Sequence, residues 1–207
     1  YRDCDGVSAP ASATINIESI SCGFSTTLQL TQLGTGIDIS PLCSSALSSC
    51  AGGPNPGAEQ YVYTGMYTLP QNCNDWVFSF NHCCRNIDIT NLVNASSEYI
   101  YIQSTLDNSG GLCNSSPTFS TLPVPYICAD QLMNYNFGTY DTDGDSLIYT
   151  LVNALGYTGG PDTLVYNTPY SPTYPITTDS GYVDFDNLTG SLTFTPDTEQ
   201  VCVVTCL

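Results

Sequence analysis

Eleven cysteines in a chain of 207 residues are the feature that most restricts its fold. Cysteines at this density are typical of an oxidising compartment, where they form disulfides. Zinc binding is the weaker interpretation, because the chain lacks paired CxxC knuckles and has a single histidine, His82. We therefore expect an extracellular or cell-surface protein. The cysteines expected in bridges are Cys4, Cys22, Cys43, Cys50, Cys73, Cys83, Cys84, Cys113, Cys128, Cys202 and Cys206.

The odd number of cysteines leaves either one free thiol or one bridge to another chain. His82 next to Cys83 suggests a catalytic pair, but neighbouring residues on a strand point to opposite faces, so we expect a structural role. We expect the adjacent Cys83 and Cys84 to be bridged to separate partners. Cys202 and Cys206 are four residues apart, too far to bond each other on an extended strand. Each therefore needs another partner, one of which can lie on another chain.

The charge of the chain excludes several classes of partner. Nineteen acidic residues face two basic ones, Arg2 and Arg85, and the net charge is −17. No basic patch can be built to neutralise phosphates, so we expect no binding to nucleic acid and no docking on anionic membranes. No apolar run is long enough to span a bilayer. Because charged residues make up only 10% of the chain, it also does not resemble a charge-rich disordered segment.

Short alternating runs rich in Thr, Val, Ile and Tyr, punctuated by Gly and Pro, predict an all-β fold. One short helical turn is expected within residues 40–50. Regularly spaced short strands are typical of β-sandwiches. The expected strands cover residues 13–18, 61–69, 76–80, 98–106, 146–152, 192–195 and 201–206.

A proline-punctuated stretch from Asn114 to Pro125 suits a stiff extended link. The density of cysteines also falls after this stretch. The sequence therefore predicts two disulfide-stapled β-sandwich modules in tandem, residues 1–113 and residues 114–207.

An aspartate-rich turn is the strongest candidate metal site. Asp141, Asp143 and Asp145 alternate around Gly144, and three carboxylates in this pattern can converge on Ca²⁺. The downstream glutamate of an EF-hand loop is absent. The alternative is a solvated Asp-Gly turn that closes a β connection. Asp184 and Asp186 alternate around Phe185 and also allow two interpretations. They can bind a metal ion, or they can lie on the solvent-exposed face of a strand.

The chain has 15 tyrosines, which allow two interpretations. They can form platforms on which sugars stack, or they can pair across half-buried strands. The tyrosines concerned are Tyr61, Tyr63, Tyr67, Tyr99, Tyr101, Tyr166, Tyr170 and Tyr174.

Three Asn-x-Ser/Thr tripeptides, at Asn94, Asn114 and Asn187, match the N-glycosylation pattern. The chain contains no GxSxG elbow, HExxH helix, phosphate-binding loop or dinucleotide fingerprint. No pair of carboxylates stands out as a glycosidase couple. We therefore expect no catalytic residues and no enzymatic activity.

Two segments resemble cadherin-like, dystroglycan-type immunoglobulin-like modules: Asp141–Leu151, with a DxDGDxLxY strand entry, and Val183–Pro196, with a TGxLxFxP hairpin. Other segments are similar to large secreted surface proteins of Bacteroidota, described as gliding-motility-associated or adhesin-like. The Cys83-Cys84-Arg85-Asn86 segment is the most specific of these. Further matching segments are Tyr1–Gly6, Asp75–Phe80, Asn114–Phe119 and Pro123–Cys128.

This resemblance implies an exported structural protein with no catalytic residues to carry over. It also implies O-glycosylation at Ser146 and Thr163, which follow aspartate and precede a hydrophobic residue. We expect an extracellular structural or adhesive module of a bacterial surface adhesin or filament, stiffened by calcium. It would pair with neighbouring copies through strand edges. The alternative is a carbohydrate-binding module that uses a tyrosine-rich face.

Overall fold

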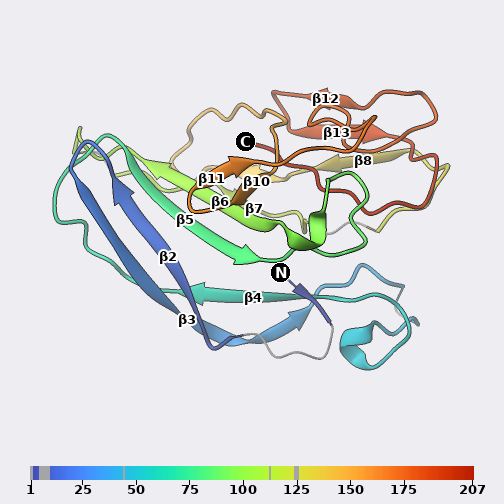
Figure 1. Ribbon diagram of the computed structural model, residues 1–207, viewed down its shortest axis with the longest axis horizontal. Helices are drawn as coiled ribbons and strands as arrows, with labels where there is room; N and C mark the ends of the chain where they lie inside the picture. Colours follow the sequence, from blue (N-terminus) through green and yellow to red (C-terminus); the bar gives the residue numbers. More distant parts are fainter. Residues whose placement is uncertain (1, 5–9, 44, 112, 124–125) are drawn as a thin grey trace. The chain divides into compact units, whose positions relative to one another are not determined.

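The computed structural model describes residues 2–4, 10–43, 45–111, 113–123 and 126–207, and these residues form an all-β structure (Figure 1). The only helical elements among them are two single 3-10 turns, η1 (Ser49–Ala51) and η2 (Ala95–Ser97). The strands are β1 (Arg2–Asp3), β2 (Ser12–Ser19), β3 (Phe24–Asp38), β4 (Ala58–Thr64), β5 (Trp76–Cys83), β6 (Tyr99–Leu106), β7 (Thr118–Phe119), β8 (Met133–Asn136), β9 (Thr139–Tyr140), β10 (Leu155–Tyr157), β11 (Pro161–Thr163), β12 (Asp184–Asp186) and β13 (Ser191–Phe194).

The described residues cluster into two compact units. The first comprises Tyr1–Phe80, Gln103–Cys113 and Leu122–Tyr126, and the second comprises Asn81–Ile102, Asn114–Thr121 and Ile127–Leu207. A change of unit falls between Cys113 and Asn114, where the sequence predicts a module boundary. The units nevertheless differ from the predicted contiguous modules, because residues 81–102 pack with the C-terminal half of the chain. Two positions of the predicted link, 124 and 125, lie outside the described residues, as do parts of the Tyr1–Gly6 and Pro123–Cys128 segments.

The main sheet is a curled, antiparallel sheet with the strand order β1-β4-β3-β2-β5-β6. The long strand β3 organises it (Figure 1). Its first half pairs with β2, from Ser19↔Phe24 to Ser12↔Thr31, and its second half pairs with β4 across an irregularity between Leu33 and Ile37. The strand β6 therefore stands at one end of the sheet.

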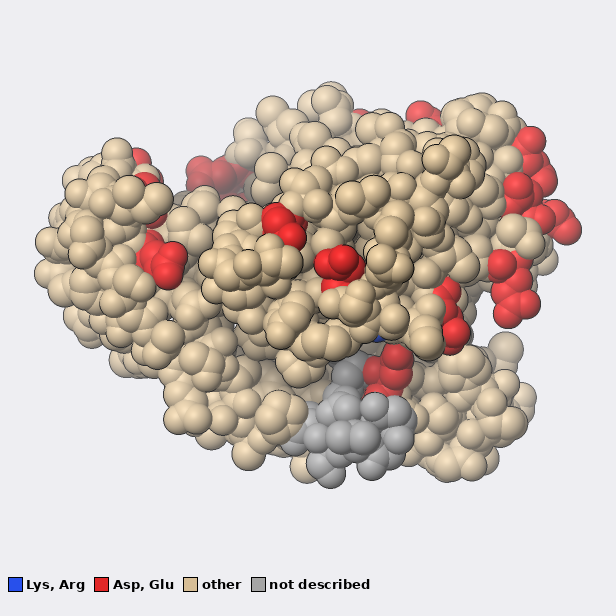
Figure 2. Space-filling view, viewed as in Figure 1, with Lys and Arg blue, Asp and Glu red and all other residues tan. Residues whose placement is uncertain are grey.

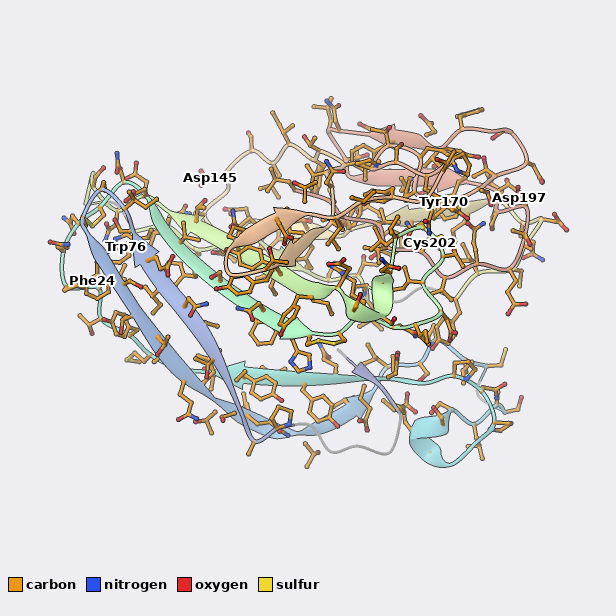
Figure 3. The ribbon with its side chains drawn as sticks, in the orientation of Figure 1. Phe24, Trp76, Asp145, Tyr170, Asp197 and Cys202 are labelled. Atoms are coloured by element: carbon orange, nitrogen blue, oxygen red, sulfur yellow. A yellow bond between two sulfur atoms is a disulfide. The ribbon has the colours of Figure 1, made fainter. Side chains whose placement is uncertain are left out.

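The core of the first unit follows from alternating burial along the first half of β3 and from the buried side chains of β2 and β5. Ile17 and Trp76 are fully buried, and the ring of Phe24 meets the edge of Trp76 with centroids 5.4 Å apart (Figure 3). The indole Nε1 of Trp76 donates to Asn108 Oδ1 at 3.1 Å, which satisfies its polar atom inside the core. Burial of aromatic and aliphatic faces at every second residue is what fixes the register of these strands.

Two disulfides fasten the first unit. Cys4–Cys50 connects the segment after β1 to η1, and Cys22–Cys73 connects the turn after β2 to the segment before β5. These bridges close loops with sequence separations of 46 and 51 residues. They confirm the expectation of disulfides, and they indicate an oxidising extracellular environment.

The second unit has shorter elements. A three-stranded sheet with the order β12-β13-β8 is accompanied by two strand pairs, β10-β11 and β7-β9. Two groups of buried side chains form its core: Leu92, Ala95, Ala154 and Leu164 in one, and Leu151, Ile176, Leu192 and Phe194 in the other.

Buried side-chain amides connect the irregular segments of the second unit. Asn91 is fully buried, and its Nδ2 donates to the carbonyls of Pro175 at 3.0 Å and Val203 at 2.8 Å. Its Oδ1 accepts from the backbone N–H of Val203 at 3.0 Å. The amide of Asn167 similarly donates to the carbonyls of Thr90 and Leu92. These side chains replace ladder hydrogen bonds that the short strands do not supply.

The all-β prediction is confirmed, and several expected strands coincide with β2, β5, β6 and β13. The segments 146–152 and 201–206 are wrong as strands, because they contribute only isolated bridges such as Leu151↔Cys206. The expected strand 61–69 ends at Thr64. The sequence prediction missed β3, although Phe24, Leu28 and Leu30 alternate along it. The short helical turn expected within residues 40–50 corresponds to η1 at its C-terminal end.

Candidate functional site

A shallow pocket of about 450 Å³ lies in the second unit. It brings together the second half of β5, the start of β6 and the turn after β10. A ligand site of this size accommodates a small molecule or one to two sugar rings. Its lining residues are Asn81, Ser97, Glu98, Tyr99, Tyr157, Thr158 and Gly159.

Three tyrosines form the aromatic part of this site. Tyr101 and Tyr157 stack nearly parallel, with ring centroids 5.9 Å apart and an interplanar angle of 9°. The ring of Tyr99 lies 6.4 Å from that of Tyr157 in a tilted arrangement. Tyr101 is buried and supports Tyr157 from behind, whereas Tyr99 and Tyr157 are half-buried and line the pocket. The rings are therefore held in place by packing before any ligand arrives.

Arg85 joins the two strands that carry these tyrosines. Its Nε donates to the carbonyl of Tyr99 at 3.2 Å, and its Nη2 donates to the carbonyl of Leu155 at 2.9 Å. Burial lowers the pKa of the guanidinium from its ordinary value, and the nearby Tyr166 and Glu98 act in the opposite direction. An arginine keeps its charge under these conditions, so Arg85 fixes the spacing of β6 and β10 and offsets the charge of Glu98.

The pocket offers polar groups suited to hydroxyl-rich ligands. Asn81, Ser97, Glu98 and Thr158 lie among the lining residues, although the hydroxyls of Ser97 and Thr158 already donate to the Asn94 carbonyl and to Asp162. Of these residues, the sequence analysis singled out only Tyr99. Tyr157 was missed because its strand is three residues long, and the pairing Gly156↔Asp162 that shapes its hairpin is not visible in the sequence.

The structure corrects the expected role of Cys83 and Cys84. These adjacent residues are bonded to each other, not to separate partners. The other two described disulfides, Cys4–Cys50 and Cys22–Cys73, lie within the first unit. The side chain of His82 is exposed on β5, the strand that ends at Cys83.

Five cysteines expected in bridges have free thiols in the structure. Cys43, Cys113 and Cys128 are exposed, and Cys202 and Cys206 are half-buried. Burial raises the pKa of the Cys202 thiol to about 11 and also raises that of Cys206. Both thiols of the C-terminal segment pack against the core that contains Leu192 and Phe194, which explains their burial. As expected, Cys202 and Cys206 are not bonded to each other.

The aspartate turn forms a loop closed by its own hydrogen bonds. Asp141 is buried, and its Oδ1 accepts from the backbone N–H groups of Asp143 at 2.8 Å and Asp145 at 3.2 Å. The carboxylate of Asp143 turns instead toward the backbone N–H of Ser115. Among the described residues, these three carboxylates do not gather their oxygens within 4.8 Å of one another. The arrangement matches the Asp-Gly turn that the sequence analysis weighed against calcium.

The other acidic candidates also have local partners. Asp186 caps the turn after β12 by accepting from the backbone N–H of Leu188 at 2.8 Å, and this hydrogen bond lowers the pKa of its carboxyl. Asp184 is exposed. In the part of the chain that the structure describes, one cluster has metal-ligand spacing: Cys4, Cys50 and Glu59. The two sulfurs of that cluster are joined in a disulfide, so they are not available as thiolate ligands.

The remaining predicted positions are accessible or lie within strands. All five expected glycosylation positions, Asn94, Asn114, Ser146, Thr163 and Asn187, are exposed. Tyr61 and Tyr63 are half-buried on β4 in the first unit, so the predicted tyrosines do not belong to one platform. Acidic side chains are scattered among uncharged ones on the face shown in Figure 2, as the composition requires. None of the helices described is long and apolar enough to span a membrane.

Comparisons with known proteins assign this chain to no group. No protein family matches it, no curated protein is similar to it, and no solved structure matches its fold.

Proposed function

We propose that this chain is an extracellular structural or adhesive module of a bacterial surface adhesin or filament, without a catalytic centre. The observation that carries this proposal is the pair of long-range disulfides, Cys4–Cys50 and Cys22–Cys73, which fasten an antiparallel sheet. Such bridges resist unfolding outside the cell, where a surface protein must persist. We also propose that the chain is related to surface proteins of Bacteroidota and that it contains immunoglobulin-like or cadherin-like sandwiches.

Self-association through a strand edge is the second part of the proposal. The terminal strand β6 leaves residues 102–105 exposed, and the side chain of Ile102 is 60% exposed. An edge of this kind is a template for pairing with another strand. We propose that neighbouring copies meet along β6.

Light scattering of the full chain at high concentration tests this pairing. Wild type is expected to form dimers or larger species. Ile102→Lys is expected to shift the distribution to monomer, because a lysine on an edge strand blocks pairing. Ile20→Lys is the matched control, since Ile20 is 93% exposed in a turn outside the β6 edge. A monomeric wild type at high concentration, with calcium present, contradicts the proposal.

Glycan recognition is a second candidate function, favoured by the pocket of Asn81, Glu98, Tyr99 and Tyr157. Aromatic faces stack on the apolar faces of sugars, and carboxylate and amide groups bind their hydroxyls. Binding of an array of neutral glycans is expected to be lost in Tyr157→Ala. It is expected to persist in Tyr182→Ala, where the replaced ring is 64% exposed and lies outside the pocket. Equal binding by the two variants removes this candidate.

Calcium and glycosylation complete the proposal. The loop of Asp141, Asp143 and Asp145 would bind calcium through carboxylate oxygens that its internal hydrogen bonds leave available. If so, EDTA lowers the midpoint of thermal unfolding, and an unchanged midpoint excludes the ion. We propose that the exposed Asn94, Asn114, Ser146, Thr163 and Asn187 carry glycans, which peptide masses of the native protein test.

A further inference from the structure

Four polar side chains converge in the second unit at a place that no predicted motif includes. Thr177 lies one residue before the bridge Thr178↔Pro196, and Asp197 follows that bridge directly. Gln200 and Cys202 follow Asp197 in the same segment, and Figure 3 labels Asp197 and Cys202. Thr177, Gln200 and Cys202 are half-buried, and Asp197 is exposed. The bridge and the buried Ile176 beside it hold the two segments together.

The hydroxyl of Thr177 is placed between a base and an amide. Its Oγ1 donates to Asp197 Oδ1 at 2.6 Å, so the carboxylate is positioned to accept the hydroxyl proton. The same Oγ1 lies 3.0 Å from Gln200 Nε2. That nitrogen also lies 3.0 Å from the carbonyl oxygen of Thr177 and 3.5 Å from that of Thr198. The two N–H groups of Gln200 therefore serve three oxygens, and the hydroxyl oxygen, which has two lone pairs, accepts at most one of these N–H groups while it donates to Asp197.

The carbonyl of Gln200 is polarised from the other side. Its Oε1 accepts from the backbone N–H of Thr177 at 3.0 Å and from the Cys202 thiol, whose sulfur lies 3.3 Å away. Burial raises the pKa of this thiol to about 11, so at neutral pH it remains an S–H donor. Two donors aimed at one carbonyl oxygen are the arrangement that stabilises the oxyanion of an acyl-transfer intermediate.

We propose that Thr177 and Gln200 form an intramolecular ester with release of ammonia. The Thr177 hydroxyl proton passes to Asp197 while Oγ1 attacks Cδ of Gln200, and the negative charge collects on Oε1. Collapse of this intermediate breaks the Cδ–Nε2 bond, and the departing nitrogen takes the proton from Asp197 and leaves as ammonia. One O–H and one C–N bond break, one C–O and one N–H bond form, and no oxidant or cofactor is needed.

The ester would give the second unit a covalent connection between the residues around Ile176 and the C-terminal segment. In the described part of this unit, the one disulfide is the local Cys83–Cys84 bond, which connects no distant segments. The alternative is a permanent hydrogen-bonded pairing of the Gln200 amide with the backbone of Thr177. The two states differ in mass, so they can be distinguished directly. This inference does not depend on the proposed function.

Intact mass spectrometry of the full chain, followed by peptide mapping after reduction and alkylation, tests the inference. Once its disulfides are reduced, the expected wild type is lighter than its sequence by one ammonia. It yields a branched peptide that contains residues 177 and 200, with Cys202 alkylated. Hydroxylamine, which cleaves esters and leaves amides intact, is expected to separate the two branches.

Variants assign the roles. Thr177→Val and Asp197→Asn are expected to keep the full sequence mass, because they remove the nucleophile and the base. The matched control is Asp186→Asn, which breaks a second Thr–Asp pair in the same unit, the 2.9 Å hydrogen bond from Thr189 Oγ1 to Asp186, and leaves the Asn187 acceptor tripeptide intact. This control is expected to lose ammonia as wild type does.

Three outcomes overturn the inference, and none depends on the folding of a variant. The first is a wild type that retains the full mass of Gln200 after prolonged incubation. The second is conversion of Gln200 to glutamate without a crosslink, which would make water the nucleophile. The third is a crosslink that blocks alkylation of Cys202, which would make the thiol the nucleophile.

Discussion

The two units satisfy their backbone polar groups in different ways. In the first unit, β2 and β3 pair over eight consecutive residues, and two long-range disulfides connect segments that are distant in the sequence. In the second unit, no described strand that lies wholly within it exceeds four residues, and amides such as Asn91 and Asn167 bridge the loops. Backbone ladders tolerate many substitutions on their exposed face, whereas a buried amide has no substitute. We therefore expect single side chains to matter more in the second unit.

The largest effect is expected at Asn91. Asn91→Ala removes the hydrogen-bond partner of the buried Pro175 carbonyl and of the half-buried carbonyl and N–H of Val203. Each unsatisfied buried group costs roughly 1–3 kcal/mol, so we expect a loss of about 4 kcal/mol in the free energy of unfolding. Urea denaturation measures the loss, and hydrogen exchange at Val203 locates it.

Asn136→Ala is the control for this comparison. Its amide also makes two backbone hydrogen bonds, to Thr189 and Gly138, but the side chain is exposed and water replaces both. We expect a loss of at most about 1 kcal/mol. Equal losses in the two variants would show that the second unit does not depend on buried amides.

A smaller effect is expected for the Cys22–Cys73 bridge. The double variant Cys22→Ser/Cys73→Ser opens a loop with a sequence separation of 51 residues, and we expect it to lower stability by about 3 kcal/mol. Trp76, the single tryptophan, lies in the same core and reports the transition by fluorescence. Cys43→Ser, at an exposed free thiol, is expected to leave the midpoint unchanged. An unchanged midpoint of unfolding in the double variant would show that this disulfide does not stabilise the first unit.

The same difference between units explains what the sequence could predict. Alternation of apolar residues identified β2, β5 and β6, because one buried face imposes a period of two. The same rule also fits β3, so the missed strand could have been predicted from its alternating residues. The pattern failed at residues 146–152, which are rich in β-branched and apolar residues but whose backbone joins its neighbours only through isolated bridges and single hydrogen bonds. Tyrosine patterns likewise identified Tyr99, but Tyr157 joins it only through tertiary packing.

Sequence reasoning also could not predict the bond between Cys83 and Cys84 or the amide contacts of Asn91. Disulfide connectivity depends on which sulfurs the fold brings together, and the spacing of cysteines does not determine it. A buried asparagine looks like any other asparagine until its partners are known. What sequence reasoning recovers is local periodicity, and what it misses are contacts between distant irregular segments.

The smallest expected effect is the loss of stability of the first unit at acidic pH. Hydrogen bonds, mainly from the hydroxyls of Ser19 and Ser21, lower the pKa of Asp75 below its ordinary value of 3.8. Hydrogen bonds from serines likewise lower the pKa values of Asp38 and Asp107 in the first unit. A carboxyl whose pKa is lowered by folding stabilises the folded state above its unfolded pKa, and this contribution is lost as the pH falls through the folded value. The first unit is therefore expected to lose stability below about pH 4.

The fluorescence of Trp76 follows this acid transition in the first unit. Asp75→Asn is expected to weaken the unit at neutral pH and to flatten the acid limb, because the titrating carboxyl is gone. Asp186→Asn removes a carboxyl of lowered pKa in the second unit and is expected to leave the Trp76 transition unchanged. If Asp75→Asn loses stability at acidic pH as wild type does, the hydrogen bonds from the serines to Asp75 do not cause the pH dependence of the first unit. The contrast between the two units would then rest on their disulfides and amides alone.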